Sequence, residues 1–485
     1  MTSSGTPPGT RSETQPGTTS SAARALLAPG GRRGAELFMT VLAILLAMAA
    51  YAAVGLGHNN QLPLDSLAYG AGLAALVLAA HFAVRRFAPY ADPILLPLAA
   101  ALNGLGLVLI HRLDLAAIDR AHQAGRHVPH GDAPLQLVWT ALGIGAFVLV
   151  LAVVRDHRQL QRYTYTAGLV GLLLLALPAL LPARFSTVHG ARIWIRLAGF
   201  SLQPGEFAKL ALMVFFAGYL VAKRDVLSLA SRRFAGIDLP RGRDLGPVLA
   251  AWFASMAVLV LEKDLGTSLL FFGMFIAMLY VATERRSWLL IGLVLFAAGA
   301  FAAYHVFGHV RDRVDIWLHP FNYASTTGYQ LVQSMFGMAS GGILGSGLGQ
   351  GRPDIVPFAN SDFIVATIGE ELGLAGLMAV LTIFGLLVLR GFRAALAVRD
   401  SFGKLLAAGL AFSMALQVFV VVGGVTRLIP LTGLTTPFLS YGGSSLLAEW
   451  ALIALLVRIS DAGRRPEDVP ATQSPDDALT QVIRR

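Results

Sequence analysis

Long apolar runs separated by short polar segments follow one another along nearly the whole chain. Twelve of these runs are close to the roughly 20 residues that an α-helix needs to cross a bilayer. They lie near residues 35–57, 66–84, 92–111, 135–154, 163–183, 206–222, 245–261, 266–282, 288–307, 363–389, 405–426 and 441–457. This pattern predicts an all-α fold, a polytopic transmembrane helical bundle of about twelve spans.

The polar segments between and beyond these runs complete the predicted organisation. Residues 1–34 are rich in Thr, Ser, Gly and Pro, and residues 461–485 are polar, so both tails are predicted to be disordered. The longest loop between spans covers about 308–362. No apolar run precedes residue 35, so the first tail does not have the pattern of a signal peptide.

Composition supports a protein that lipid must solvate. Of the 485 residues, 55% are hydrophobic and only 14% are charged, with a mean hydropathy of +0.64. Soluble domains carry about 25% charged residues, so this apolar surplus does not fit one water-soluble core. The chain contains no cysteine, which excludes disulfides, zinc–thiolate sites and thiol nucleophiles.

The distribution of the basic residues predicts how the chain is oriented. The formal net charge is +10, but the charges are scattered between apolar runs instead of gathered on one soluble face, which argues against a nucleic-acid partner. If both termini are cytoplasmic, the inner loops collect a dense set of basic residues, as the positive-inside rule requires. These are Arg85, Arg86, Arg155, Arg158, Arg162, Lys223, Arg224, Arg232, Arg233, Arg241, Arg243, Arg285, Arg286, Arg390, Arg393, Arg399 and Lys404. The loops at 184–205, 262–265, 308–362 and 427–440 are then predicted to face outside.

Asp362 is a candidate for chemistry in the outer loops. It stands where the longest loop returns into an apolar run, so its carboxylate is expected to be partly desolvated. Desolvation raises the pKa of a carboxylate and suits it to act as a general base. The alternative is that Ser361 or Asp362 caps the next helix. Glu370 and Glu371 follow within the apolar run, where carboxylates are costly and often functional.

Two further features of the long loop precede Asp362. Residues 331–338 place Leu, Val, Met and Phe at helical spacing, which predicts an amphipathic helix lying on the membrane. Residues 341–351 contain six glycines, which permit positive φ and close backbone approach to a ligand. A flexible loop is the alternative, and the Lys-Ser/Thr of a phosphate-binding Walker A loop is missing.

Three other polar segments punctuate the spans. Glu206 and Lys209 are three residues apart on one helix face, so they can form an ion pair that orients helices or lines a cavity. Asp264, in a very short outer turn, could cap the next helix or belong to a site. Residues 430–445 contain two prolines and three glycines, which break helix and predict a cavity wall.

Taken together, these segments resemble the SEDS family, which includes RodA, FtsW and SpoVE. The most distinctive are SDFIVATIGEELG, from Ser361, and PLTGLTTPFLSYGGSS, from Pro430. The resemblance implies a ten-span core at 91–460, preceded by two additional N-terminal spans at 35–90. These additional spans and the long tail are most similar to RodA-like members from actinobacteria.

The resemblance implies a peptidoglycan glycosyltransferase. Such an enzyme polymerises lipid II into β-1,4 glycan strands at the outer face of the bacterial cytoplasmic membrane, here for cell elongation and shape, with cell division left open. Asp362 matches the catalytic aspartate of the family. The residues expected to bind substrate are Glu206, Lys209, Arg192, Arg196, Asp264, Gln330, Ser440, Gly442 and Gly443. The chain departs from the family pattern at Gly205, Glu262, Lys263, Ile193 and Val421.

Partners and alternatives follow from the same resemblance. It implies a class B penicillin-binding protein as transpeptidase partner, since the chain lacks the full S-x-x-K, S-D-N and K-T-G motif set. No metal ligand is assigned, but Mg²⁺ or Mn²⁺ could assist, and Lys263 and Arg427 join the arginines as candidates for binding pyrophosphate. The alternatives are a lipid II flippase or other lipid-linked transporter, and a non-catalytic scaffold.

Overall fold

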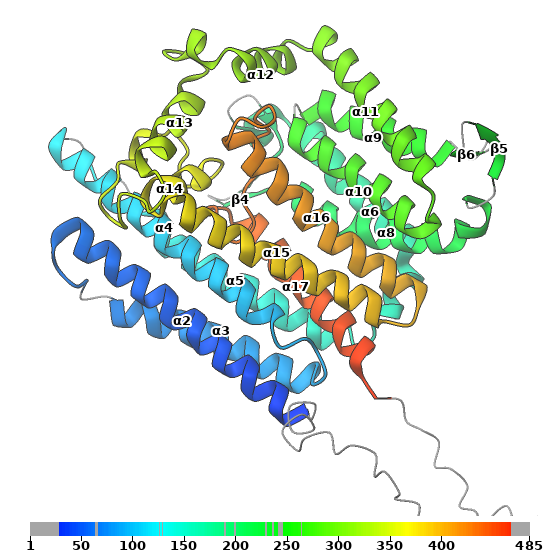
Figure 1. The fold of residues 1–485 in the computed structure, drawn as a ribbon, viewed down its shortest axis with the longest axis horizontal. Helices are drawn as coiled ribbons and strands as arrows, with labels where there is room; N and C mark the ends of the chain where they lie inside the picture. Colours follow the sequence, from blue (N-terminus) through cyan, green and yellow to red (C-terminus); the bar gives the residue numbers. More distant parts are fainter. Residues whose placement is uncertain are drawn as a thin grey trace, which may run out of the picture.

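The computed structural model describes residues 29–466, except 64–65, 126, 129, 189–190, 198–199, 228–229, 235–236, 241–245 and 263. Within these residues, long helices run side by side in one bundle, with the shorter helices of residues 308–371 at one end (Figure 1). The first helix begins at Pro29 and the last ends at Arg464, so helix extends into both predicted tails. The remaining tail residues, 1–28 and 467–485, lie outside the described part.

The described elements fall into three groups. The long helices are α2 (Pro29–Asn59), α3 (Ser66–Phe87), α4 (Leu95–Gln123), α5 (Asp132–Val153), α6 (Thr164–Leu180), α8 (Pro204–Leu227), α9 (Gly246–Glu262), α10 (Leu265–Thr283), α11 (Arg286–Val306), α15 (Gly373–Ala397), α16 (Ser401–Val425) and α17 (Gly443–Arg464). The shorter helices are η1 (His157–Tyr163), α7 (Ala183–Ser186), α12 (Gly308–Leu318), η3 (Pro320–Tyr323), α13 (Tyr329–Gly341), η4 (Pro353–Ile355) and α14 (Ile364–Glu371). The strands are β1 (Thr187–Val188), β2 (Ala191–Arg192), β3 (Ile195–Leu197), β4 (Phe200–Leu202), β5 (Ala230–Phe234) and β6 (Ile237–Pro240).

The long helices confirm a polytopic membrane protein. Among the described residues, eleven helices are long and apolar enough to cross a bilayer, and α9, which matches the predicted span at 245–261, is a shorter apolar helix. Most residues of α4, α10, α16 and α17 are buried, so these helices form the centre of the bundle. In contrast, α6, α11 and α15 bury less than a third of their residues inside the protein, as helices in contact with lipid do.

The strands are a departure from the all-α prediction. They form three two-stranded antiparallel hairpins in which β1 pairs with β2, β3 with β4, and β5 with β6. The first two hairpins lie in the segment between α7 and α8, and the third lies between α8 and α9. All three occupy connections between long helices, so the helical architecture of the bundle is unchanged.

The segment around Asp362 differs from its prediction in two ways. The predicted span at 363–389 is broken, because α14 ends at Glu371 and Gly373, the first residue of α15, adopts φ +68°. The predicted amphipathic helix is α13, but it packs against α14 with Leu331 and Val332 buried, so part of its apolar face contacts protein while Phe336 stays exposed. An apolar helix face buries itself equally well against lipid or against another helix, which is why the pattern did not distinguish them.

Candidate active site

Asp362 lies in the turn that leads into α14, and its carboxylate does not cap that helix. Phe363 occupies the cap position of α14, which has no side-chain cap hydrogen bond. The helix-cap interpretation of Asp362 is therefore wrong. Phe358, four residues before Asp362, has a φ of +57°, and Phe438, in the loop before α17, has a φ of +61°. Backbone strain of this kind in residues with large side chains is typical of functional sites.

Arg313 of α12 is the cation beside Asp362. Its Nη1 donates a hydrogen bond to the carbonyl oxygen of Leu431 at 2.8 Å. A Cβ atom placed on Gly433 would lie 3.7 Å from Nη2 of Arg313 and 3.8 Å from Oδ2 of Asp362. The guanidinium and the carboxylate therefore converge over Gly433, whose φ of +78° favours glycine. Arg313 could not be identified from the sequence, because its partners lie far along the chain.

Asp264 caps α10 and also faces the site. Its Oδ1 accepts a hydrogen bond from the backbone N of Thr267 at 3.0 Å, and its Oδ2 accepts one from the Thr267 hydroxyl at 2.6 Å. The cap interpretation of Asp264 is confirmed. Burial raises the pKa of Asp264, and the hydrogen bonds from Thr267 oppose that rise.

The surroundings of Asp362 place its pKa close to neutrality. Burial, the largest effect, raises the pKa of Asp362 to about 6, and the charge of Asp264 adds to the rise. The Arg313 guanidinium and a hydrogen bond from Ser361 oppose it. A carboxyl group with this pKa is mostly ionised at pH 7 and can still accept a proton, as a general base must.

The broken segment, residues 426–442 between α16 and α17, is fastened to the turn that carries Asp362. The hydroxyl of Ser440 donates to the carbonyl oxygen of Ser361 at 2.6 Å and accepts from the backbone N of Thr436 at 2.8 Å. The backbone N of Tyr441 donates to the carbonyl oxygen of Asn360 at 2.7 Å. Ser440, one of the predicted substrate-binding residues, thus holds the two loops together.

Gly442 and Gly443 fix the same segment to α5. The backbone N of Gly442 donates to Oε1 of Gln136 at 3.3 Å. A Cβ atom on Gly443 would lie 2.3 Å from the indole of Trp139, so only glycine allows this approach. The structure gives both glycines a packing role, and their predicted contact with substrate stays a prediction.

Glu206 and Lys209 form the predicted ion pair within a larger buried network. Nζ of Lys209 lies 3.1 Å from Oε2 of Glu206, 2.7 Å from Oε1 of Glu449 and 2.9 Å from Oε1 of Gln417. Gln417 in turn donates to the carbonyl oxygen of Thr435 at 3.0 Å, which links the network to the broken segment. Our sequence reasoning missed Glu449, although a carboxylate inside an apolar span is a recognisable signal.

Glu370 and Glu371 do not face the candidate site, and the glycine-rich segment wraps around them. Oε1 of Glu371 lies 2.8 Å from Nε of Arg112, and Oε1 of Glu370 accepts from the backbone N of Arg352 at 2.6 Å. The backbone N of Gly349 donates to Oε2 of Glu371 at 3.2 Å. These carboxylates therefore fasten a loop to α14, which corrects their interpretation as functional groups.

The remaining predicted residues have different settings. Arg192 in β2 and Arg196 in β3 have exposed side chains, and Gln330 is half-buried in the first turn of α13. The guanidinium of Arg427 is bound to the carbonyl oxygens of Trp317 and Leu318, at the end of α12. Lys263 lies outside the described residues.

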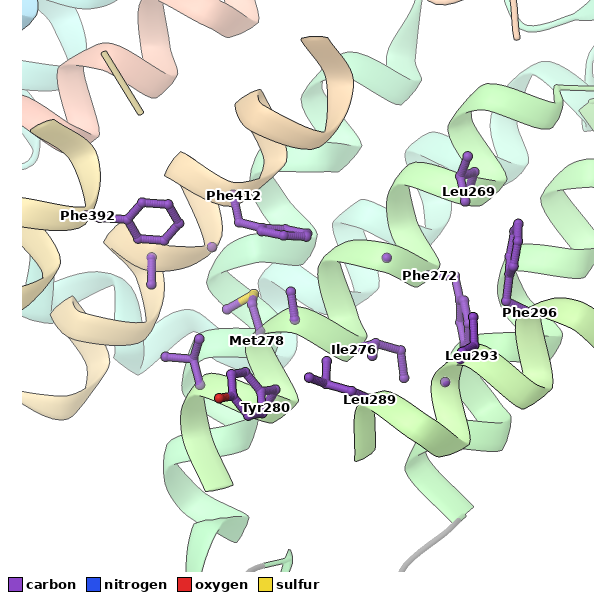
Figure 2. A pocket seen from close by; sticks show the side chains of 16 residues that line it. Leu269, Phe272, Ile276, Met278, Tyr280, Leu289, Leu293, Phe296, Phe392 and Phe412 are labelled. Atoms are coloured by element: carbon purple, nitrogen blue, oxygen red, sulfur yellow. The ribbon is translucent and has the colours of Figure 1, made fainter. Parts of the chain in front are cut away.

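Two apolar cavities lie between the helices. One, of 580 Å³, is bounded by α6, α8, α9 and α10, and its lining includes Glu262, two residues before Asp264. The other, of 530 Å³, is bounded by α10, α11, α15 and α16, and Figure 2 shows its aromatic wall, including Phe272, Phe392 and Phe412. The first cavity reaches the neighbourhood of the site, whereas the lining of the second includes none of the site residues.

Metal ligands can be assessed within the described part of the chain. There, no group of three or more His, Cys, Asp or Glu side chains is placed to hold a metal ion. Asp264 and Asp362 offer two carboxylates, and Mg²⁺ commonly takes one or two carboxylates together with substrate phosphates. These two residues would hold such an ion if substrate supplied the other ligands.

Comparison with known proteins places the chain in a family. The family model for FtsW, RodA and SpoVE, described as cell cycle protein, matches residues 93–465. The chain belongs to this family. This membership confirms the SEDS resemblance and covers the site, from Asp264 to the segment before α17.

Similar SEDS proteins include a curated relative and two solved structures. The chain is 55% identical over 456 residues to peptidoglycan glycosyltransferase RodA of Mycobacterium tuberculosis H37Rv, covering 94% of this chain and 96% of the relative. One solved structure concerns the structural coordination of polymerization and crosslinking by a peptidoglycan synthase complex. Its chain superposes with a TM-score of 0.60 at 28% identity, and the match covers 78% of this chain and 99% of that one. Thermus thermophilus rod shape determining protein RodA gives a TM-score of 0.51 at 26% identity, covering 78% and 98%. The fold is thus RodA-like.

Proposed function

We propose that this SEDS protein is a peptidoglycan glycosyltransferase that polymerises lipid II into β-1,4 glycan strands at the outer face of the cytoplasmic membrane. Its similarity to mycobacterial RodA supports the activity. The observation that carries the mechanism is the carboxylate of Asp362 facing Arg313 over Gly433, near an apolar cavity. The role would serve cell elongation and shape.

Asp362 is the general base of the proposed reaction. It takes the proton from the 4-hydroxyl of the acceptor GlcNAc, whose oxygen attacks C1 of the donor MurNAc. As the new C–O bond forms, the bond from C1 to the pyrophosphate oxygen breaks, and the electron pair leaves with undecaprenyl pyrophosphate. One displacement converts the α-linked donor into a β-link, so inversion needs no covalent enzyme intermediate.

Arg313 is the candidate for stabilising the leaving group. Pyrophosphate gains negative charge as the bond breaks, and a positioned cation lowers the energy of that transition state. The Arg313 side chain is part-buried and faces Asp362, while the guanidinium of Arg427 is occupied by the end of α12. Arg313 is therefore preferred over the cations that the sequence pointed to.

The apolar cavity between α6, α8, α9 and α10 suits the lipid of the substrate. Its lining is almost entirely apolar, with residues such as Leu175, Phe216 and Phe271, and it also includes Glu262. A polyprenyl chain in this cavity would gain about 25 cal/mol for each Å² of apolar surface removed from water. The sugar would then lie near Asp264 and Asp362.

Orientation and partner complete the proposal. Both termini would be cytoplasmic, which places the 308–362 segment and Asp362 outside. Similarity to a chain of a peptidoglycan synthase complex supports a class B penicillin-binding protein as the crosslinking partner.

Vesicles containing purified protein and lipid II separate the proposed enzyme from a transporter. Wild type and Asp312→Ala, which removes an exposed carboxylate next to Arg313, should make glycan polymer, and Asp362→Ala should make none. All three proteins should leave the sidedness of unreacted lipid II unchanged. Translocation of lipid II that survives Asp362→Ala would support the flippase instead.

Adding a chelator to the wild-type reaction tests whether a divalent cation assists.

A further inference from the structure

The first two helices, α2 and α3, precede the region that the family model matches. That match begins at residue 93, after the end of α3. The similarity to M. tuberculosis RodA extends over 456 residues of a 485-residue chain, so it includes nearly all of both helices. Figure 1 shows this hairpin along one side of the bundle, where α2 packs on α4, and α3 packs on α5. The hairpin is therefore an addition to the family core that is shared with this relative.

The inner end of α2 is fixed by a buried ion pair. Arg33 and Glu36 are paired with each other, and Oε1 of Glu36 lies 2.8 Å from Nδ1 of His81 in α3. Arg33 also donates to the carbonyl oxygens of Pro89 and Ala88, at 3.0 and 2.8 Å, in the connection to α4. Charges buried this deeply are tolerated only when their partners are held in place, so this end of the hairpin is rigid.

The outer end of α2 contacts the backbone of the glycine-rich segment, residues 341–351. A Cβ atom on Gly57 would lie 2.0 Å from the carbonyl oxygen of Leu348. A Cβ atom on Gly349, which has φ +84°, would lie 2.6 Å from the carbonyl oxygen of Val54 and 2.9 Å from the backbone N of His58. A glycine on each side therefore allows the helix and the segment to touch. The Leu348 side chain packs against Tyr51 and Val54.

The opposite side of the glycine-rich segment holds the end of α14. The backbone N of Gly349 donates to Oε2 of Glu371 at 3.2 Å, and the backbone N of Gly347 donates to the Glu371 carbonyl oxygen at 3.0 Å. Arg112 of α4 bridges the two, with Nε 2.8 Å from Oε1 of Glu371 and Nη2 2.7 Å from the carbonyl oxygen of Gly351. Gly349 thus touches α2 on one side and Glu371 on the other.

The helix α14 connects this contact to the candidate site. All eight of its residues are buried, and it begins two residues after Asp362. A helix of this length is about 12 Å long and moves as one body, so a displacement at Glu371 also displaces Asp362.

We propose that the α2–α3 hairpin is a strut that positions Asp362, acting through Gly57, the glycine-rich segment and α14. The role rests on the proposed function of Asp362, and Gly57 is a positioning residue that does not touch substrate. Misplacing a catalytic group by about 1 Å can cost roughly a hundredfold in rate, so a rigid support for α14 has a direct use.

The test compares Gly57→Ala with Gly34→Ala, a control in the same helix. A Cβ atom on Gly34 meets nothing within 4 Å, whereas the one on Gly57 meets Leu348. Alanine is the better helix former at both positions, so loss of helix propensity does not explain any defect. We expect amide hydrogen exchange in residues 345–351 and 364–371 to accelerate about tenfold in Gly57→Ala and to stay unchanged in Gly34→Ala.

Lipid II polymerisation gives a second readout. The rate should fall about tenfold in Gly57→Ala. The acidic midpoint of its pH–rate profile should differ from the wild-type value, because displacing Asp362 changes its distances to Arg313, which lowers its pKa, and to Asp264, which raises it. A protein that is only less well folded would lose rate and keep the wild-type midpoint.

The outcomes are distinct. Wild-type exchange in Gly57→Ala, or a lower rate with unchanged exchange and midpoint, would overturn the strut. If wild type makes no polymer, the proposed function fails, and hydrogen exchange still decides whether the hairpin supports α14. If Gly57→Ala does not fold, Leu348→Ala removes the packing against Tyr51 and Val54 without adding a clash, and it should show the same changes to a smaller degree.

Discussion

At the scale of single residues, the site depends on how Asp362 is ionised. Burial, the charge of Arg313 and the charge of Asp264 all act on its carboxyl group, and they act in opposite directions. Burial and Asp264 raise its pKa, while Arg313 lowers it, with a result of about 6. The general base is the ionised form, so activity should be low in acid and rise as pH increases through this pKa.

The pH–rate profile of lipid II polymerisation therefore tests the charges around Asp362. We expect an acidic limb with a midpoint near 6 in wild type. Asp264→Asn keeps a capping oxygen for Thr267 and removes a negative charge, so the midpoint should fall by about one unit. Arg313→Gln removes the positive charge, so the midpoint should rise by about one unit, and the plateau should also fall if Arg313 stabilises the leaving group. Identical midpoints in the three proteins would contradict this account of the site.

How much of the site was predictable differs from residue to residue. Asp362 was predictable because a lone carboxylate where a loop meets an apolar run is unusual, and its motif is distinctive. Arg313 was not, because it lies in a polar helix among other charged residues, and only the fold brings it to Gly433. Glu371 was misinterpreted because its partner, Arg112, lies in a distant helix.

At the scale of elements, hydrophobic patterns located the helices better than their ends or surroundings. The break between α14 and α15 depends on Gly373, whose φ is +68° and whose Cβ, if present, would lie 2.3 Å from the backbone N of Gly345. That contact joins segments far apart in the chain, so an apolar run alone predicted one continuous span. Likewise, α4 extends to Gln123, well beyond its apolar run, because its outer part packs on protein.

The Lys209 network joins helices α8, α16 and α17, and removing its cation tests how much it holds them together. Lys209→Met leaves Glu206 and Glu449 buried without their cation, which should lower the free energy of unfolding by about 3–5 kcal/mol. The matched control is Lys404→Met, which removes an exposed lysine and should change little. Adding Glu206→Gln and Glu449→Gln to Lys209→Met should restore most of the lost stability. Thermal unfolding in detergent measures all four proteins, and a Lys209→Met variant as stable as wild type would show that the network is dispensable.

At the scale of the whole molecule, the bundle carries its candidate chemistry at one end. Asp362, Arg313 and Asp264 lie in or beside the segments that the positive-inside rule places outside. The orientation could be predicted from the basic residues, because their distribution depends on the loop sequences alone and needs no tertiary contact. The strut role of the α2–α3 hairpin was not readable, because it depends on glycine contacts between α2 and residues 341–351.

The absence of cysteine allows the orientation to be tested with single cysteine variants. Ser325→Cys places an exposed thiol between η3 and α13, and Gln159→Cys places one in η1, in a predicted inner loop. A membrane-impermeant maleimide applied to intact cells should label the first and not the second. After permeabilisation, both should react. Labelling in the reverse order would show that the termini lie outside and would remove Asp362 from the outer face.

The central claim is that the carboxylate of Asp362 is the general base of glycan polymerisation. The most direct measurement is the initial rate of lipid II polymerisation by purified Asp362→Asn, which keeps the shape of the side chain and removes its basicity. We predict a rate about 10²- to 10⁴-fold below wild type, with thermal stability preserved. A folded Asp362→Asn protein that polymerises lipid II within about twofold of the wild-type rate would contradict the account.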